Sequence, residues 1–496
     1  MWIVLLRLLR AGLGLVVVVL GGSAYAFTDG DFDTSFGDGS GFQVTTPAPS
    51  YLFNTYDLAV GPDGSLTASG TTLYDAPNSY DLTSCLLSAD GAFDNCTSFG
   101  FDLGGSNEDR DNGGVAYTPD GKRILAGFAV GPAADPRYRI GFLALEPTND
   151  LHTEFGQGGR LLLEFPGNAF PMGVTVQRNG DIVFAGYFNH EPSSPGTGVD
   201  CVVGRLLPGG APDPGFGAGG LQTIGWDQGG PSTDECNAVA TYPDGRVVAA
   251  GFAEPSPQDL HFALARLTAL GEPDPDFGSG GKLLVPLDDV GGQWGLAKAV
   301  AVDRKNRVIA AGTFSTGHGS RFVVVRTTEA GELDGSFHGT GKVDFSVSGN
   351  LDDALTGVRL AILPPPSNDV VVIGTYQSAV LGTGVFVAVL RDDGTFDTSF
   401  HGTGLNAFSV PSHDPAGYSG GLAIQGGRIV VAGGFNGGTP DQSRLWVGRF
   451  NMHQISGDDF ESGDLRFWSS QCPEVGTGSA LEDECAPIDS IHSLRD

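Results

Sequence analysis

The main shortage in this 496-residue chain is of charged side chains, above all of basic ones. Asp, Glu, Lys and Arg make up 17% of the residues, whereas about 25% is typical. The chain has 27 Lys and Arg against 58 Asp and Glu, which gives a formal net charge of −31. Because strong negative charge repels phosphate backbones and anionic membrane surfaces, we expect no nucleic acid among the partners of this protein.

The sequence also lacks common signatures of catalysis. It contains no H-x-x-x-H, G-x-S-x-G or C-x-x-C motif, and its nine His residues are mostly isolated. Carboxylate pairs such as Asp288-Asp289 and Asp352-Asp353 occur in expected loops, but a glycosidase needs two carboxylates at a defined separation. The sequence therefore identifies no catalytic or cofactor-binding residue, and it favours a protein that is not an enzyme.

Long apolar runs are missing except near the N-terminus. There, Arg7 and Arg10 precede an uncharged stretch of twelve residues, Ala11–Gly22. A small-x-small cleavage sequence follows at Ala24-Tyr25-Ala26. This pattern predicts a secretory signal peptide over residues 1–26, because twelve residues are too few to cross about 30 Å of hydrocarbon. We expect an exported protein without a membrane span, located outside the cell, at its surface or in the periplasm.

Cysteine is scarce but even in number, with six residues in the chain. An even number in an exported chain predicts three disulfides. Six cysteines allow 15 pairings, and proximity in sequence favours Cys85 with Cys96 and Cys472 with Cys485. Cys201 and Cys236 are then left for each other, and no spacing matches a zinc site.

Metal-binding patterns are weak. Asp29, Asp31 and Asp33 have the first spacings of a calcium loop, but Thr34 and Ser40 stand where an EF-hand has Gly and Glu. The stretch NEDRDNGG at 107–114 is similar. We therefore expect no cofactor and no metal ligand, with a looser calcium site as the alternative.

Glycine, in contrast, is abundant, with 78 residues. Much of it belongs to a recurring phrase, D-x-x-F-G-x-G-G, whose second copy has two additional residues before the phenylalanine. The phenylalanines are separated by 63, 56, 61, 61, 60 and 63 residues, so the period is close to 60. The phenylalanines are Phe36, Phe99, Phe155, Phe216, Phe277, Phe337 and Phe400, and the regular aspartates are Asp33, Asp213, Asp274, Asp334 and Asp397.

This phrase resembles a phosphate-binding loop in GSGGK, at 278–282. A P-loop needs G-x-x-x-x-G-K-[ST] before a helix, yet Asp276 occupies the first glycine position and Leu283 follows the lysine. A structural role explains more. The aspartate can bond a backbone N–H two residues on, the phenylalanine can fill apolar space, and the glycines can adopt left-handed angles. His338 and His401 take the first glycine position in two copies, which indicates a turn there as well.

A second phrase, of the form P-D-G-[KR]-[IV]-[VL]-x-A-G, keeps step with the first. Each unit therefore carries four short β-rich runs separated by turn residues, and no segment has a sustained helical period. Four-stranded units at a fixed period predict a β-propeller. We expect an all-β ring of about seven blades over residues 27–454, closed by pairing the N- and C-terminal strands in one blade. A β-solenoid is the alternative.

The two phrases together resemble the delta-60 repeat, which occurs in tandem in exported bacterial proteins and is taken to form β-propellers. The resemblance covers about residues 27–450. It implies an architecture, and it brings neither a reaction nor a ligand.

Residues 455–496 depart from the repeat. The stretch DDFESGDLRFW resembles a short tail, G-F-E-x-G-x-x-x-x-W, at the ends of many exported bacterial proteins, with Asp459 in place of the first glycine. Such a tail implies sorting or surface retention. Alternatively, Phe460 lies 60 residues after Phe400, so the segment could be a decayed eighth unit.

Three functions remain open. The first is an exported scaffold that binds a protein or carbohydrate through loops on one face of the ring, and the sequence favours it because the blades are near-identical. The second is a structural or adhesive component of the cell surface. The third is a polysaccharide-active enzyme that uses loop carboxylates. We expect a monomer.

Overall fold

The computed structural model describes most of the chain between residues 30 and 451. The described ranges are 30–45, 52–73, 80–101, 103, 109–132, 134–189, 198–226, 232–256, 259–287, 290–291, 294–316, 319–349, 354–378, 381–408, 418–435 and 444–451. The predicted signal peptide, the C-terminal tail, Cys472 and Cys485 lie outside them.

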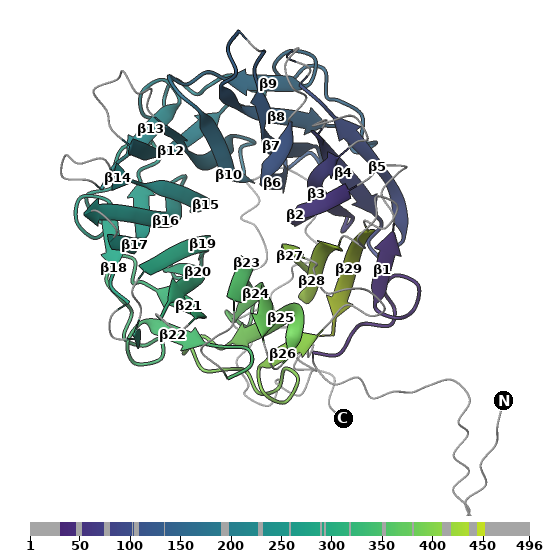
Figure 1. The fold of residues 1–496 in the computed structure, drawn as a ribbon, viewed down its shortest axis with the longest axis vertical. Coiled ribbons are helices and arrows are strands. Elements are labelled where there is room, and N and C mark those ends of the chain that lie inside the picture. Colours follow the sequence, from purple (N-terminus) through teal and green to yellow (C-terminus); the bar gives the residue numbers. More distant parts are fainter. Residues whose placement is uncertain are drawn as a thin grey trace, which may run out of the picture.

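Seven sheets stand radially around a central axis and form a closed ring (Figure 1). Each is an antiparallel blade of four strands, and β14 (Ser232–Thr233) adds a short parallel strand to the third. The described residues contain no α-helix, and so none that could cross a membrane. The prediction of an all-β propeller with seven four-stranded blades is therefore confirmed.

The strands of a blade follow one another from the axis outward. Blades 1 to 3 are β2 (Leu52–Val60), β3 (Leu66–Leu73), β4 (Tyr80–Leu87) and β5 (Phe93–Phe99); β6 (Arg110–Tyr117), β7 (Arg123–Val130), β8 (Tyr138–Leu145) and β9 (Arg160–Leu163); β10 (Ala169–Val176), β11 (Ile182–Asn189), β12 (Gly198–Leu206) and β13 (Leu221–Ile224). Blades 4 to 6 are β15 (Glu235–Thr241), β16 (Val247–Ser256), β17 (Asp259–Leu267) and β18 (Lys282–Val285); β19 (Trp294–Val302), β20 (Val308–Ser315), β21 (Ser320–Arg326) and β22 (Lys342–Phe345); β23 (Ala354–Ile362), β24 (Val370–Ser378), β25 (Gly382–Leu390) and β26 (Leu405–Phe408).

Blade 7 closes the ring with strands from both ends of the chain. It consists of β27 (Tyr418–Gln425), β28 (Arg428–Phe435), β29 (Arg444–Phe450) and β1 (Phe42–Thr45). β1 pairs with β29 in antiparallel register from Phe42↔Gly448 to Thr45↔Leu445. The predicted closure by N- and C-terminal strands is confirmed. Because β1 pairs with β29, the outer edge of β29 is not exposed to pairing with another chain.

The second and third strands of each blade are almost continuously apolar because both of their faces are buried. In β20, Val308 and Ala310 pack with blade 4, whereas Ile309 and Ala311 pack with blade 6. Successive side chains of a strand point to opposite faces. A strand in the middle of a blade that is packed between two neighbouring blades therefore needs apolar residues at nearly every position. The same alternation makes each blade too exposed to be stable without its neighbours.

Each innermost strand carries a β-bulge, and the glycine of the second phrase accommodates it. In blade 4 the register shifts between Cys236 and Ala238, opposite Gly251. A Cβ on Gly251 would lie 1.8 Å from the carbonyl oxygen of Glu235. Only glycine therefore fits where the bulged strand approaches its neighbour.

The first phrase forms a turn between the third and fourth strands of a blade, and we call it the anchor turn. In blade 4, Asp274 accepts a hydrogen bond from the N–H of Asp276 at 3.1 Å, and Phe277 is fully buried. Phe277 packs against Gly331 in the next blade, where a Cβ would lie 2.8 Å from the ring. His338 and His401 have φ of 51° and 49°, similar to the 54° of Gly278 that they replace.

The other anchor residues occupy equivalent places. Phe36, Phe155, Phe216, Phe337 and Phe400 are 0% exposed, and Asp33, Asp213, Asp334 and Asp397 each accept the N–H two residues on. Phe99 differs, because it is the last residue of β5 and follows no anchor turn. β4 and β5 are instead joined by a short turn at residues 88–92 and pair along their whole length.

Four blades also connect to the next one through an arginine, in what we call the arginine latch. In blade 4, Arg266 contacts the carboxylate of Asp274 at 2.7 Å and lies over the ring of Phe277, and its Nη1 donates to the carbonyl of Glu329 in blade 5. The other latch arginines are Arg205, Arg326 and Arg449. An arginine suits this place because one planar group can stack and donate at the same time.

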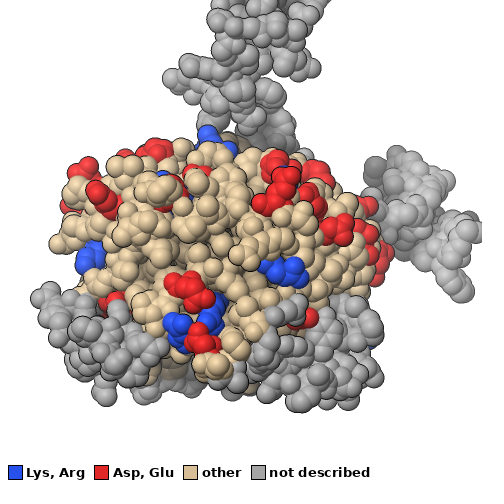
Figure 2. Space-filling view, turned by 90° about the horizontal axis from the view of Figure 1, so that it is seen from above, with Lys and Arg blue, Asp and Glu red and all other residues tan. Residues whose placement is uncertain are grey.

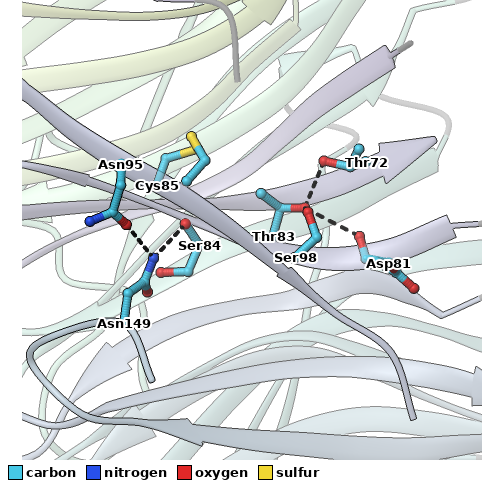
Figure 3. Close-up of a disulfide and its surroundings, with 9 residues drawn as sticks. Thr72, Asp81, Thr83, Ser84, Cys85, Asn95, Ser98 and Asn149 are labelled. Atoms are coloured by element: carbon cyan, nitrogen blue, oxygen red, sulfur yellow. Dashed lines mark hydrogen bonds between the residues drawn. A yellow bond between two sulfur atoms is a disulfide. The ribbon is translucent and has the colours of Figure 1, made fainter. Parts of the chain in front are cut away.

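Blade 1 has neither the anchor turn nor the latch, and other contacts connect it to blade 2 (Figure 3). Asn149 stands where other blades have the glycine that receives the phenylalanine, with φ of 73°. Its Nδ2 donates to the carbonyl of Ser84 at 3.1 Å and to Oδ1 of Asn95 at 2.9 Å. The disulfide Cys85–Cys96 joins β4 to β5 beside these contacts.

The second described disulfide, Cys201–Cys236, joins β12 of blade 3 to β15 of blade 4. Two of the three expected pairings are therefore present, one within a blade and one between blades. The third, Cys472–Cys485, lies outside the described residues.

Candidate functional site

The innermost strands bring polar side chains to the axis at a position where most blades have none. Directly after the bulge, five blades place Gly or Ala, namely Gly114, Gly173, Ala238, Ala299 and Gly421. The two exceptions are Asp57 in β2 and Arg359 in β23. Their side chains are 24% and 32% exposed, so they are partly shielded from water without being cut off from it.

Asp57 and Arg359 face each other across blade 7. Nε of Arg359 lies 3.9 Å from Oδ1 of Asp57, and its Nη2 donates to the carbonyl of Tyr56 at 2.5 Å. Blade 7 permits this reach because it has Gly420 and Gly421 at its bulge. A Cβ on Gly420 would lie 2.2 Å from the carbonyl oxygen of Thr55, so the two blades approach as closely as their backbones allow.

Asp57 also contacts blade 2, next to a second carboxylate. Its Oδ2 accepts the N–H of Val115 at 3.2 Å, and Asp111 accepts the N–H of Gly114 at 3.0 Å. Burial raises the pKa of Asp57, and this effect outweighs the positive charge of Arg359, which would lower it. Burial also raises the pKa of Asp111 to about 7, against hydrogen bonds from Ser69 and Gly114 and with help from the charge of Asp57.

A second pair of opposite charges lies on the other side of the axis. Glu235 in β15 and Lys298 in β19 are half-buried, and Nζ of Lys298 is 3.4 Å from Oδ1 of Asn237. Burial raises the pKa of Glu235, opposed by Lys298, and burial lowers the pKa of Lys298, opposed by Glu235. The charge of Arg359 lowers the pKa of Lys298 further. We call Asp57, Asp111, Glu235, Lys298 and Arg359 the axial cluster.

Aromatic rings of blades 3 and 5 lie at the end of the propeller where the innermost strands begin. Phe170 and Tyr187 of blade 3 have ring centroids 5.2 Å apart and are half-buried. Trp294, the first residue of β19, is 52% exposed. Burial and the charge of Glu235 raise the pKa of Tyr187 to about 12, so its hydroxyl stays protonated and can donate a hydrogen bond.

Of these axial residues, only Asp111 lies in a stretch that the sequence singled out, NEDRDNGG at 107–114, where a loose calcium site was the alternative. The carboxylate pairs Asp288-Asp289 and Asp352-Asp353 and the first calcium-loop residue, Asp29, lie outside the described residues. Within the described part, no three His, Cys, Asp or Glu side chains are placed to hold a metal ion.

Asp57 and Arg359 could have been recognised as charged residues at a repeat position where the five other blades have Gly or Ala. Finding that position would have required an alignment of the innermost strands, whose sequences are irregular.

On the side of the ring that Figure 2 shows, no large patch of one charge is present among the described residues. Uncharged side chains cover most of the surface in Figure 2, and acidic ones stand in small groups with a few basic ones between them. In this view the net negative charge is therefore dispersed.

Comparison with known proteins supports the architecture. The family described as "Domain of unknown function (DUF5122) beta-propeller" matches residues 243–277 and 306–337, which lie in blades 4 and 5. No curated protein matches the chain in sequence. Part of the chain is thus similar to a β-propeller repeat family.

Several solved structures align with most of the chain at low identity. A protein of unknown function from Dyadobacter fermentans aligns with 83% of this chain and all of its own, at 13% identity and a TM-score of 0.42. The polysaccharide lyase Uly1 aligns with 82% and 99%, at 10% and 0.49. An α-L-arabinanase from Penicillium chrysogenum, complexed with arabinobiose, aligns with 83% and 97%, at 10% and 0.44.

Proposed function

We propose that this protein is an exported β-propeller scaffold that binds a carbohydrate at the axial cluster. The observation that carries the proposal is that five blades each bring one ionisable side chain to the axis, three of them acidic and two basic. Opposite charges nearly balance, so neither an anion nor a cation is strongly selected. A ligand that both donates and accepts hydrogen bonds at many points suits such a surface.

The aromatic residues favour a sugar over other polyhydroxylated ligands. A sugar ring presents C–H groups on its faces and hydroxyls at its edge, so it can lie against an aromatic ring while its hydroxyls meet charged groups. Tyr187 is close enough to Glu235 for that charge to raise its pKa, and Phe170 contacts Tyr187. Trp294 exposes a third ring at the start of β19, the strand that carries Lys298. Binding sites commonly combine apolar and aromatic walls with a few placed polar groups.

Binding to an array of neutral glycans, followed by calorimetric titration of the best ligand, tests this proposal. Trp294→Ala removes an exposed ring from β19, the strand that carries Lys298, and should weaken binding at least tenfold with little change in stability. Leu270→Ala, at a residue 63% exposed in the turn between β17 and β18, is the matched control and should bind normally. Equal binding by both variants would exclude the axial site.

A polysaccharide-active enzyme is the second candidate, and the pair Asp57 and Asp111 favours it. Two neighbouring carboxylates with raised pKa values can divide the roles of acid and base. Asp111 is fully buried, so it would act only through Asp57. Release of reducing ends or unsaturated products from polysaccharides, abolished in Asp57→Asn, would establish catalysis, whereas binding without turnover leaves the scaffold.

We further propose that residues 1–26 direct export and that residues 455–496 retain the chain at the surface or sort it. The structural or adhesive alternative depends on that tail. Release of the protein into the medium after deletion of 455–496 would support it.

A further inference from the structure

At six of the seven blade interfaces, the same two side chains fill the space beside the anchor turn. One is the anchor phenylalanine, and the other is a buried aliphatic residue at the start of the next blade's second strand. The six pairs are Phe36 with Leu66, Phe155 with Ile182, Phe216 with Val247, Phe277 with Val308, Phe337 with Val370 and Phe400 with Ile429. All twelve side chains are at most 1% exposed.

The interface between blades 1 and 2 has neither member of the pair. Blade 1 has no anchor turn, and the aliphatic position in blade 2 is Arg123, the first residue of β7. A pocket of about 690 Å³ occupies this place, lined among others by Pro62, Phe93, Tyr117 and Arg123. The pocket thus lies at the one described interface where this pair of side chains is absent.

Arg123 is an unusual residue to find at the base of a pocket. It is 1% exposed, and its Nη2 donates to the carbonyl of Glu146. Its Nε and Nη1 have no hydrogen-bond partner among the described residues. The latch arginines differ, because each contacts the carboxylate of an anchor aspartate. Arg123 thus has the guanidinium of a latch without its carboxylate.

An unpaired buried guanidinium is unfavourable, and burial lowers the pKa of Arg123 accordingly. The charges of Tyr117 and Asp63 oppose this lowering. Nε and Nη1 still have no hydrogen-bond partner among the described residues, so an acceptor in the pocket that Arg123 lines would supply one. A carboxylate is the acceptor that arginine pairs with best in proteins. Phosphate and sulfate are less suitable, because the exposed Asp63, Asp94 and Asp120 also line the pocket and repel a dianion.

We propose that this pocket binds a small hydroxylated monocarboxylate, with its carboxylate on Arg123. The hydroxyl groups of the ligand would donate to Asp63 and Asp94, which also line the pocket and whose carboxylates are acceptors only. Tyr117 and Phe93 provide the apolar wall of the pocket. The site lies at a blade interface and shares no residue with the axial cluster, so it does not depend on the carbohydrate proposal.

The test is a calorimetric or NMR titration of the full chain with D-gluconate, with sorbitol as the uncharged polyol and inorganic phosphate as the dianion. Gluconate should bind saturably, and sorbitol and phosphate at least tenfold more weakly. Arg123→Leu restores the residue type of the six other blades, so it should fold normally and lose gluconate binding. Lys305→Ala is the control, since Lys305 pairs with Asp392 at blades 5 and 6, neither residue lines this pocket, and binding should stay unchanged.

A second variant keeps Arg123 and obstructs the pocket. Ala92 is exposed and lines it, so Ala92→Phe should weaken gluconate binding at least tenfold without altering the guanidinium. Binding of gluconate by Arg123→Leu as tight as by the native protein would overturn the proposal. Equal affinity for sorbitol, or no saturable gluconate binding to the native chain, would overturn it as well.

Discussion

Arg449 and Asp33 are 416 residues apart in the chain, and their side chains form an ion pair with 2.8 Å between Nε and Oδ2. Both side chains are only 7% exposed. Arg449 belongs to β29, the third strand of blade 7, and Asp33 precedes β1, the fourth. The two ends of the chain are therefore joined by a buried charge pair in addition to the β-ladder.

Breaking this pair should destabilise the closed ring. We expect Asp33→Asn to lower the free energy of unfolding by about 3–5 kcal/mol, because it leaves a buried arginine without its carboxylate. Asp397→Asn is the matched control, since its partner Arg391 is 48% exposed and an exposed pair contributes about 0–1 kcal/mol. Denaturant unfolding measures both, and similar losses would contradict a special role for closure.

The same pair should respond to acid. Burial opposes ionisation of Asp33, but hydrogen bonds from Ser35 and the charges of Arg449 and Arg428 outweigh it and lower its pKa. A lowered folded-state pKa gives stability that is present above the unfolded pKa of about 4 and is lost as the pH falls through the folded value. Native protein should therefore lose more stability than Asp33→Asn below about pH 4, as thermal unfolding across pH would show.

Removal of an anchor side chain should be costly where the ring is fully buried. Phe277→Ala should lower the free energy of unfolding by about 3–5 kcal/mol, because Phe277 is 0% exposed between two blades. Leu270→Ala serves as the control and should change it by less than about 0.5 kcal/mol. A small effect of Phe277→Ala would mean that the anchor turns do not connect the blades.

The buried carboxyl at the axis should make stability fall with rising pH. Burial raises the pKa of Asp111 from 3.8 to about 7, so the folded chain holds more protons than the unfolded chain between these values. Stability contributed by protonated Asp111 is therefore full below about pH 4 and declines towards pH 7. Asp111→Asn should remove this slope and be more stable than the native protein at pH 8 by roughly 1–3 kcal/mol.

Asn149 allows the replacement for the missing anchor to be tested. Both Asn149→Gly and Asn149→Ala remove the hydrogen bonds to Ser84 and Asn95, but only alanine keeps a side chain at φ of 73°. The alanine variant should therefore be less stable than the glycine variant by about 1–2 kcal/mol. Equal stability would show that the backbone relaxes at this turn.

The period and turn chemistry were sufficient to predict the ring, its blade number and its closure. Phe277 and its equivalents recur at fixed spacing, and their burial follows from the need to fill space between blades. Phe99 fills apolar space between blades 1 and 2, as an anchor phenylalanine should, but it does so from the end of β5 and not from an anchor turn. In blade 1, β5 pairs with β4 through the residues where the sequence predicted an anchor turn before Phe99. No residue in this stretch indicates that the turn is absent.

The axial cluster could not be predicted in the same way. Asp57 and Arg359 are distant in sequence, and they meet only because blade 7 places Gly420 and Gly421 between them. Arg123 was overlooked for a different reason. It follows Lys122 in a turn phrase where a basic residue is ordinary, and only the strand register shows that it stands in an aliphatic position.

The strand that completes blade 7 is the first one made, and its partner is the last. During synthesis, β1 has to wait through the assembly of about six blades before β29 exists to receive it. Until then, the ring stays open at one side, with the edge of β1 and the apolar face of blade 6 both uncovered. Truncation anywhere before β29 would therefore leave β1 without its partner and blade 7 without its third strand.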